Sequence, residues 1–340
     1  MPLLKVTTLF SLATLLAVPL LAEGANPARP GTLNYIEGNA SIDGRALTSH
    51  SVGNTEIEAG GTLATANGKA EILLTPGVFL RVGENSVVRM ISPNLTHTEV
   101  AIDRGRAEVE VDQLHKQNGI QIDVKNGQAL LLKDGLYEFN ADDNTVRVFD
   151  GKAAAYEGLS PAKGVKAITV KGGQELSLAS ENVKPVKFDA KPKDNTGDDL
   201  YKWSSLRSEY LGEANEDLAE RYAYGYTGAG PFASGWLWDP ALYGYTWLPG
   251  DGLFYSPFGY GFYSPYYLYG GGVIYGGHRY GGYGYRGYEG RGYEGRGGFH
   301  DGGRVRAGNS GGGFHGGEGG GGFHGGGGGG GSHGGGGSHR

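Results

Sequence analysis

The chain has 340 residues, no cysteine, 67 glycines and a formal net charge of -6 at pH 7. The lack of cysteine excludes disulfide scaffolds, lipid attachment through an N-terminal cysteine and thiol catalysis. Both signs of charge are mixed along the β-patterned part of the chain, which argues against a duplex-binding surface, so nucleic acid is not expected as a partner.

Residues 1–22 have the pattern of a secretory signal peptide. Lys5 provides a positive n-region, an apolar run covers residues 9–21, and the small residue Ala22 stands at the cleavage zone. The alternative is an uncleaved anchor, but the run is shorter than the ~20 residues that a span needs, and Pro19 interrupts it. We therefore expect cleavage near Ala22, a periplasmic or extracellular location, and no transmembrane span in the mature chain.

Residues 30–180 are predicted to form a β domain. Apolar and polar residues alternate in short runs that end at turn signals such as Pro76-Gly77. The expected strands are 32–38 and 39–44, which form an opening hairpin, and then 69–74, 78–82, 86–91, 99–102, 107–111, 120–124, 129–132, 136–140, 145–149, 152–156, 167–170 and 174–178. This pattern predicts a mainly β fold, an antiparallel β-sandwich or β-roll with one face buried and the other exposed to water.

Two segments of this region resemble a known family. They are GKAEILLTPGVFLRVGENS, from Gly68 to Ser86, and IDRGRAEVEV, from Ile102 to Val111. Their glycines, Gly77, Gly83 and Gly105, stand where tight turns favour a positive φ. The segments are similar to the FecR-type periplasmic domain, and the resemblance extends over residues 30–180.

The resemblance implies a role in recognition. FecR-type proteins that regulate transcription carry a cytoplasmic N-terminal segment that acts on a sigma factor, followed by a membrane span. Here the predicted signal peptide leads directly into the β domain, which departs from that pattern. The resemblance therefore implies only the periplasmic recognition of a ligand or protein.

Residues 181–197 are polar and contain two prolines, which predicts a linker. An amphipathic helix is predicted over residues 198–222, with a weak capping box formed by Thr196 and Asp199. Its apolar residues are spaced by three and four: Leu200, Trp203, Leu206, Tyr210, Leu211, Ala214, Leu218 and Tyr222. We expect this helix to pack on the β domain or on its neighbours, and binding to a partner is the alternative.

Residues 223–277 form an aromatic module rich in glycine and proline. A short repeat, FYSPFGYG and then FYSPYYLY, begins at Phe254 and again at Phe262. The module resembles C-terminal extensions of exported FecR-domain proteins such as those of Acidobacteria. Three interpretations remain open for it: a membrane span, which its prolines and glycines oppose, peripheral contact with the envelope, or compact aromatic packing.

Residues 278–340 are of low complexity and are predicted to be disordered. The wide spacing of the tail histidines matches no defined metal site: His300, His315, His324, His333 and His339. The arginines Arg286, Arg291 and Arg296 resemble an RNA-binding tract, but Glu289 and Glu294 offset their charge.

Three further motifs have simpler interpretations than a site. The cluster Asn140, Asp142, Asp143 and Asn144 could offer oxygens to calcium, but it lacks the spacing of a calcium loop, so a hairpin turn is favoured. Asp112 and His115 lie three residues apart without a nucleophile motif. Asn94-Leu95-Thr96 fits a glycosylation sequon, interpreted as chance in a bacterial setting.

The sequence thus predicts no catalytic residue, no cofactor and no metal site. Our main hypothesis is a non-catalytic exported envelope protein whose FecR-like domain is a scaffold that recognises a protein or ligand, with an unknown envelope protein or polymer as partner. One alternative is an adhesive surface protein that acts through its Tyr/Gly-rich segment, with peripheral envelope contact through residues 223–277. The other is a periplasmic component of a sigma-factor signalling pathway.

Overall fold

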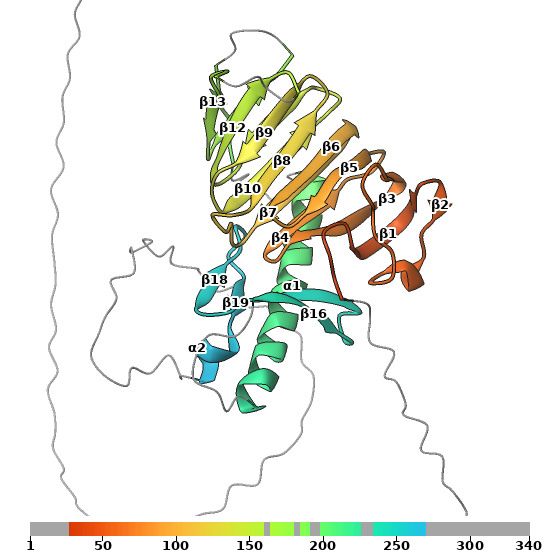
Figure 1. The fold of residues 1–340 in the computed structure, drawn as a ribbon, viewed down its shortest axis with the longest axis vertical. Coiled ribbons are helices and arrows are strands. Elements are labelled where there is room, and N and C mark those ends of the chain that lie inside the picture. The colour runs from red at the N-terminus through yellow and green to blue at the C-terminus, as the bar shows by residue number, and fades with distance from the viewer. Residues whose placement is uncertain (1–26, 160–163, 180–183, 191–197, 226–233, 270–340) are drawn as a thin grey trace, which may run out of the picture. The chain divides into compact units, whose positions relative to one another are not determined.

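The computed structural model describes residues 27–159, 164–179, 184–190, 198–225 and 234–269 (Figure 1). The predicted signal peptide, part of the predicted linker and the Gly-rich tail lie outside these residues. Within the described part of the chain, no helix has the length and apolar character needed to cross a membrane.

Fifteen strands form one large sheet, which confirms a mainly β fold. The strands are β1 (Leu33–Ile42), β2 (Arg45–Ala46), β3 (Thr62–Thr75), β4 (Val78–Val82), β5 (Val87–Asn94), β6 (His97–Arg104), β7 (Arg106–Val111), β8 (Gly119–Val124), β9 (Gly127–Leu131), β10 (Gly135–Asn140), β11 (Thr145–Val148), β12 (Lys152–Glu157), β13 (Ile168–Lys171), β14 (Gln174–Ser177) and β15 (Val186–Lys187). A short 3₁₀ helix, η1 (Ser49–Ser51), follows β2. The strand β15 lies within the segment predicted as a linker and pairs with β14.

The sheet curls into two layers around one core (Figure 1). Strands β13, β12, β9, β8, β6 and β5 follow one another in the first layer, and β4, β7, β10, β11, β14 and β15 in the second. The long strand β3 joins the layers, since its first half pairs with β5 and its second half with β4. Inward-facing residues of both layers, among them Leu63, Ile102, Val109, Tyr137 and Leu176, belong to one buried cluster.

One strand pair departs from the predicted antiparallel arrangement. Strands β6 and β8 run parallel, with His97 beside Gly119 and Ile102 beside Val124. Strand β7, which lies between them in the chain, belongs to the other layer and pairs there with β4 and β10. Alternation of apolar residues could not reveal this crossover, because its period is the same in parallel and antiparallel strands.

The predicted opening hairpin is wrong in its position. Residues 33–42 form the single strand β1, and the turn falls at Asp43 and Gly44 rather than at Gly38 and Asn39. At Gly38 the pairing of β1 with β3 shifts register instead, as at a β-bulge. A glycine in a strand pattern therefore marked an irregularity here and not a turn.

A helix and two hairpins cover part of the second layer. Helix α1 (Asp199–Gly225) is followed by a hairpin of β16 (Gly235–Asp239) and β17 (Gly244–Leu248), a hairpin of β18 (Leu253–Tyr255) and β19 (Gly261–Tyr263), and the short helix α2 (Pro265–Tyr269). The Asp198 carboxylate accepts a hydrogen bond from the Leu200 N–H at 2.9 Å, so Asp198 caps the helix. A second buried cluster joins sheet, helix and hairpins: Leu73, Phe79, Leu211, Tyr245, Trp247 and Phe262.

This arrangement favours compact packing among the three interpretations of the aromatic module. Trp247 and Phe262 are fully buried, and the Trp247 ring lies 5.5 Å from the Phe262 ring between centroids. The Asn215 amide on α1 donates to the carbonyl oxygens of Trp247 at 2.9 Å and Tyr263 at 3.1 Å. The described part of the module is therefore built into the same fold as the sheet.

The buried face of α1 is more polar than the apolar spacing predicted. Leu206, Tyr210 and Tyr222 are 41–45% exposed, although they belong to the predicted apolar stripe. Polar residues take places on the buried face instead: Ser204, Arg207, Ser208 and Asn215. They lie there because the sheet face beneath the helix also carries charged side chains.

Candidate functional site

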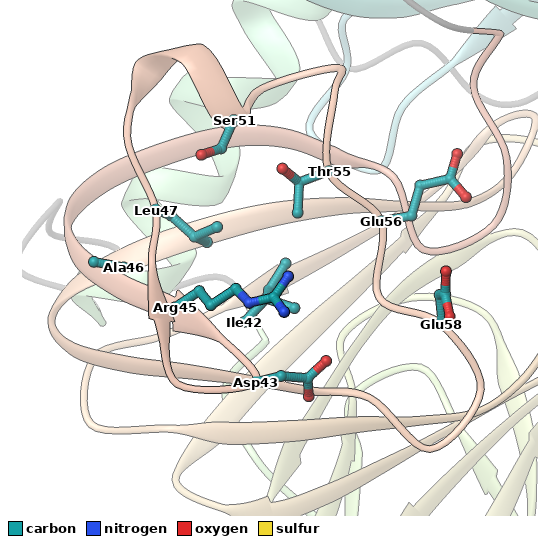
Figure 2. Close-up of a pocket in the computed structure, with 9 residues that line it drawn as sticks. All are labelled: Ile42, Asp43, Arg45, Ala46, Leu47, Ser51, Thr55, Glu56 and Glu58. Carbon is teal, nitrogen blue, oxygen red and sulfur yellow. The ribbon is translucent and has the colours of Figure 1, made fainter.

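A groove runs beside the N-terminal hairpin of the sheet (Figure 2). Its volume is about 540 Å³, within the range of ligand pockets. Nine residues line it: Ile42, Asp43, Arg45, Ala46, Leu47, Ser51, Thr55, Glu56 and Glu58. Two stretches of chain thus form its walls, one around β2 and one between η1 and β3. Figure 2 shows them facing each other, with Arg45 reaching between them.

The wall around β2 follows from a two-residue turn. Asp43 and Gly44 have φ values of 49° and 76°, the positive pair that a type I′ turn needs. This turn brings Arg45 opposite Ile42. Strand β2 pairs with β1 alone, so its other edge has no neighbouring strand.

Ala46 is the residue of β2 whose backbone faces outward. Its partner on β1 is Ser41, and the next residue, Leu47, donates its N–H to the Ala40 carbonyl at 2.9 Å. Hydrogen-bonded and non-bonded pairs alternate along an antiparallel ladder, so Ser41 and Ala46 form a non-bonded pair. The N–H and C=O groups of Ala46 therefore point away from β1.

On the opposite wall, the backbone groups of Glu56 also point away from the stretch with which Glu56 pairs. The Thr55 carbonyl accepts a hydrogen bond from the 31–33 stretch, and the Ile57 N–H donates one to it, each at 2.9 Å. Glu56 lies between them, paired with Thr32 in an isolated bridge. The Glu56 backbone groups thus point away from the 31–33 stretch. Ile57 is 1% exposed and anchors this wall in the core.

The side chains of the groove are predominantly acidic. Asp43, Glu56 and Glu58 contribute three carboxylates and Arg45 one guanidinium, a balance of one minus three, or -2. The Asp43 carboxylate accepts a hydrogen bond from the Thr62 N–H at 2.8 Å. Within the described ranges, no hydrogen bond or ion pair engages the side chains of Arg45, Glu56 or Glu58. These three groups are available to a ligand.

A second pocket of about 500 Å³ adjoins the same wall. It shares Glu56 and Glu58 with the groove and extends to Arg29 and to Leu95 at the tip of the β5–β6 hairpin. Leu95 is 50% exposed. The two carboxylates therefore stand on a ridge between two hollows.

A different group of charges lies beneath α1, and we call it the buried ion cluster: Glu71, Arg81, Glu110 and Arg207. Arg81 on β4 is fully buried and pairs with Glu110 and, at 2.9 Å, with Glu71. Arg207 on α1 donates to Glu71 at 3.0 Å. The Ser208 hydroxyl donates to Glu110 at 2.8 Å. The helix is thus joined to the sheet by charges as well as by apolar contact.

The arginines determine the charge states of this cluster. Burial alone would raise the pKa of Glu71, but Arg207 and Arg81 outweigh it and hold that pKa below its usual range. Burial likewise disfavours the charged form of Arg81, yet Glu110 and Glu71 raise its pKa. Glu71 and Arg81 therefore remain charged near neutral pH.

Two buried acids nearby lack such partners. Neither carboxylate of Glu108 or Asp112 forms a hydrogen bond of ordinary length among the described residues, and the Ser204 hydroxyl beside Glu108 opposes the rise of its pKa only in part. Burial, with the nearby charge of Glu138, raises the pKa of Glu108 to about 8. Burial and Glu110 raise the pKa of Asp112 well above its usual range. Glu108 is therefore expected to hold its proton at neutral pH.

The prediction that the outer face of the second layer is exposed to water is in part wrong, because α1 covers part of that face. Register places charged residues opposite one another across five neighbouring strand pairs: Glu71 with Arg81, Arg81 with Glu108, Glu108 with Glu138, Glu138 with Arg147, and Arg147 with Glu175. Sequence alternation placed these residues on one face but could not distinguish a covered face from a solvated one.

The Asn140 cluster forms a turn, the interpretation favoured over calcium. The Asn140 side-chain oxygen accepts hydrogen bonds from the Asp142 N–H at 2.9 Å and the Asp143 N–H at 3.2 Å. Asp142 in turn accepts a bond from the Gly105 N–H at 3.1 Å. The side chains thus close the β10–β11 hairpin. Among the described residues, no group of three or more His, Asp or Glu is arranged to hold a metal.

Other residues singled out by the sequence are not brought together. No hydrogen bond joins Asp112 to His115 within the described ranges, and Asp112 is 2% exposed. In the sequon, the Asn94 side chain accepts bonds from the N–H and hydroxyl of Thr96, each at 2.9 Å. The tail histidines and arginines lie outside the described residues.

The groove residues were missed by sequence reasoning. Arg45, Glu56 and Glu58 are ordinary surface charges in the sequence, and no motif groups them. The one available signal was Asp43-Gly44, a strong type I′ turn dipeptide that fixes the place of β2.

Comparison with known proteins matches residues 61–154 to the family model described as FecR protein. Two solved structures of a "putative anti-sigma factor" from Parabacteroides distasonis ATCC 8503 are similar to this chain. The first has 12% identity and a TM-score of 0.32 and covers 47% of this chain and 74% of its own. The second has 13% identity and a TM-score of 0.31 and covers 46% and 71%.

A search among curated proteins finds no match. The family match spans β3 to β11 completely, together with the first residues of β12. It contains both segments on which the sequence resemblance was based. Residues 61–154 of this chain are therefore a FecR domain.

Proposed function

We propose that this chain is a non-catalytic, protein-recognising component of a sigma-factor signalling pathway and acts outside the cytoplasm. The match of residues 61–154 to the FecR family supports a regulatory role. The resemblance noted in the sequence implies that this chain would supply the periplasmic recognition step of such a pathway, and a separate protein would act on the sigma factor. The signal-peptide pattern of residues 1–22 supports export.

The observation that carries the proposal is the unequal covering of the large sheet and of the segments beside it. Part of the second layer lies beneath α1. Arg207 and Ser208 on this helix donate hydrogen bonds to Glu71 and Glu110 of the sheet. The groove beside β2, in contrast, has backbone edges at Ala46 and Glu56 that pair with no further strand among the described residues, and the side chains of Arg45, Glu56 and Glu58 form no hydrogen bond or ion pair there. Recognition at an open edge needs no catalytic group.

The experiment is deletion of the gene, followed by measurement of transcripts and complementation with the full chain. We expect the genes of one sigma-factor regulon to change in expression and the full chain to restore them. Unchanged transcripts in the conditions under which the gene is expressed would overturn the signalling role.

A further inference from the structure

We propose that the groove beside β2 binds an extended, basic segment of a partner protein, which adds to the sheet as a strand. This inference rests on the proposed function, since it specifies the surface and the chemistry by which a partner would be recognised. Three features of the groove support it: its backbone edges, its charge and its apolar floor.

The backbone edges come first. Ala46 and Glu56 line opposite walls of the groove, and each directs its N–H and C=O away from the strand that it already pairs with. An extended segment between the walls can exchange hydrogen bonds with either residue, as in strand addition. Because β2 has only two residues, backbone pairing alone offers few bonds. Side chains must supply much of the affinity.

Charge decides which segment fits. Glu56 and Glu58 lie two residues apart, with Ile57 between them turned into the core, so both carboxylates stand on the same side of this wall. Asp43 adds a third carboxylate at the turn. Among the residues that line the groove, Arg45 carries the single positive charge. A basic segment is therefore favoured over an acidic one.

The floor favours an apolar residue between the basic ones. Ile42 is 6% exposed at the base of the groove, and Leu47 is partly buried beside it. Side chains alternate in an extended chain, so one residue can face this floor while its neighbours reach toward the carboxylates. The expected ligand sequence thus alternates basic and apolar residues.

The test uses the full chain and the peptide Lys-Val-Lys-Val-Lys-amide, labelled with fluorescein at its N-terminal amine, with binding followed by fluorescence anisotropy at low salt. Two comparison peptides replace lysine by glutamate or valine by proline. We expect saturable binding of the basic peptide, weaker binding of the proline peptide because proline removes the backbone N–H at two positions, and no binding of the glutamate peptide.

Variants of the protein give effects of opposite sign. The double substitution Glu56→Gln and Glu58→Gln should weaken binding about tenfold, whereas Arg45→Ala should tighten it about threefold. The matched control, Glu213→Gln with Glu220→Gln on the exposed side of α1, removes the same charge and should change nothing. Ala46→Pro should weaken binding by removing one backbone donor at an edge that tolerates proline.

Absence of saturable binding up to about 1 mM, equal binding of the glutamate peptide, or equal effects of the groove and control variants would overturn this inference. These failures are separable from failure of the proposed function. If the transcript response depends on the gene but not on Glu56 and Glu58, the signalling role stands and the groove is not its surface.

Discussion

Arg207 on α1 donates to the carboxylate of Glu71 on β3 at 3.0 Å, although 136 residues separate them in the chain. Both side chains are buried, and the Arg207 guanidinium also lies 3.9 Å from the centre of the Tyr35 ring. This contact ties the segment after the FecR domain to the face of its sheet. The helix is therefore part of the domain's structure and not an appendage.

Arg207→Met should destabilise the protein by about 3 kcal/mol. It leaves the buried Glu71 carboxylate with Arg81 and the Asn34 amide but without its second cation, and breaking a buried pair is costly. Urea denaturation followed by circular dichroism measures the change. Lys202→Ala, on the exposed side of the same helix, should stay within about 0.5 kcal/mol of wild type. Equal stability of the two variants would contradict a structural role for the buried ion cluster.

Stability should fall as the pH rises from 5 to 8. The pKa of Glu108 is about 8 in the folded state, so over this range the folded protein holds a proton that the unfolded chain releases. Its stabilising effect is complete at low pH and is lost toward the folded-state pKa, with a slope of at most about 1.4 kcal/mol per pH unit. Urea midpoints at several pH values measure this slope.

Glu108→Gln provides the matched variant for the pH series. A neutral amide of nearly the same shape removes the titration, although Glu138, Arg81 and Arg106 still surround the position. The slope should become shallower, and the variant should be more stable than wild type at pH 8. An unchanged slope would show that Glu108 does not titrate in this range.

Gly77→Ala should loosen the contact between the FecR domain and the hairpin of β16 and β17. Gly77 has a φ of +81°, and an added Cβ would lie 3.2 Å from the Trp247 ring. Gly173→Ala is the matched control, because its φ is +77° and the space around it is open. Both variants carry backbone strain of about 1 kcal/mol, and only Gly77→Ala should also alter Trp247 fluorescence. The same spectrum for both would contradict the packing described here.

Much of the sheet could be predicted from sequence, for a physical reason. Inward-facing residues such as those of β4 and β7 form continuous alternating patterns, and turn dipeptides mark where strands end. The parallel pairing of β6 with β8 could not be predicted, because it depends on where β7 goes and not on local pattern. The burial of Arg81 could not be predicted either, since its charge is satisfied by carboxylates of two other strands, Glu71 on β3 and Glu110 on β7.

The groove was beyond sequence reasoning for a similar reason. Its two walls come from stretches that are each unremarkable, and only the turn at Asp43 and Gly44 brings Arg45 opposite Ile42. Glu56 and Glu58 point to the same side of their wall because Ile57, between them, is buried in the core. Such a site arises from tertiary packing rather than from a motif.

Removing residues 198–340 should make the FecR domain unstable. The truncation uncovers Leu73 and Phe79 and leaves Arg81 and both its carboxylates without the helix that shields them. We expect aggregation or a strongly lowered thermal midpoint in a melting experiment. Removal of residues 279–340 alone takes away no contact described here and should leave the midpoint unchanged. Equal midpoints for the two truncations would contradict the role of α1.

The most direct test of the account is photo-crosslinking in native cells from a photoreactive residue at position 46. The account predicts capture of one partner protein from this position, loss of that capture with Glu56→Gln and Glu58→Gln, and no capture of it from position 220 on α1. Capture of the same proteins from both positions, or capture that persists in the double variant, would contradict recognition at the groove.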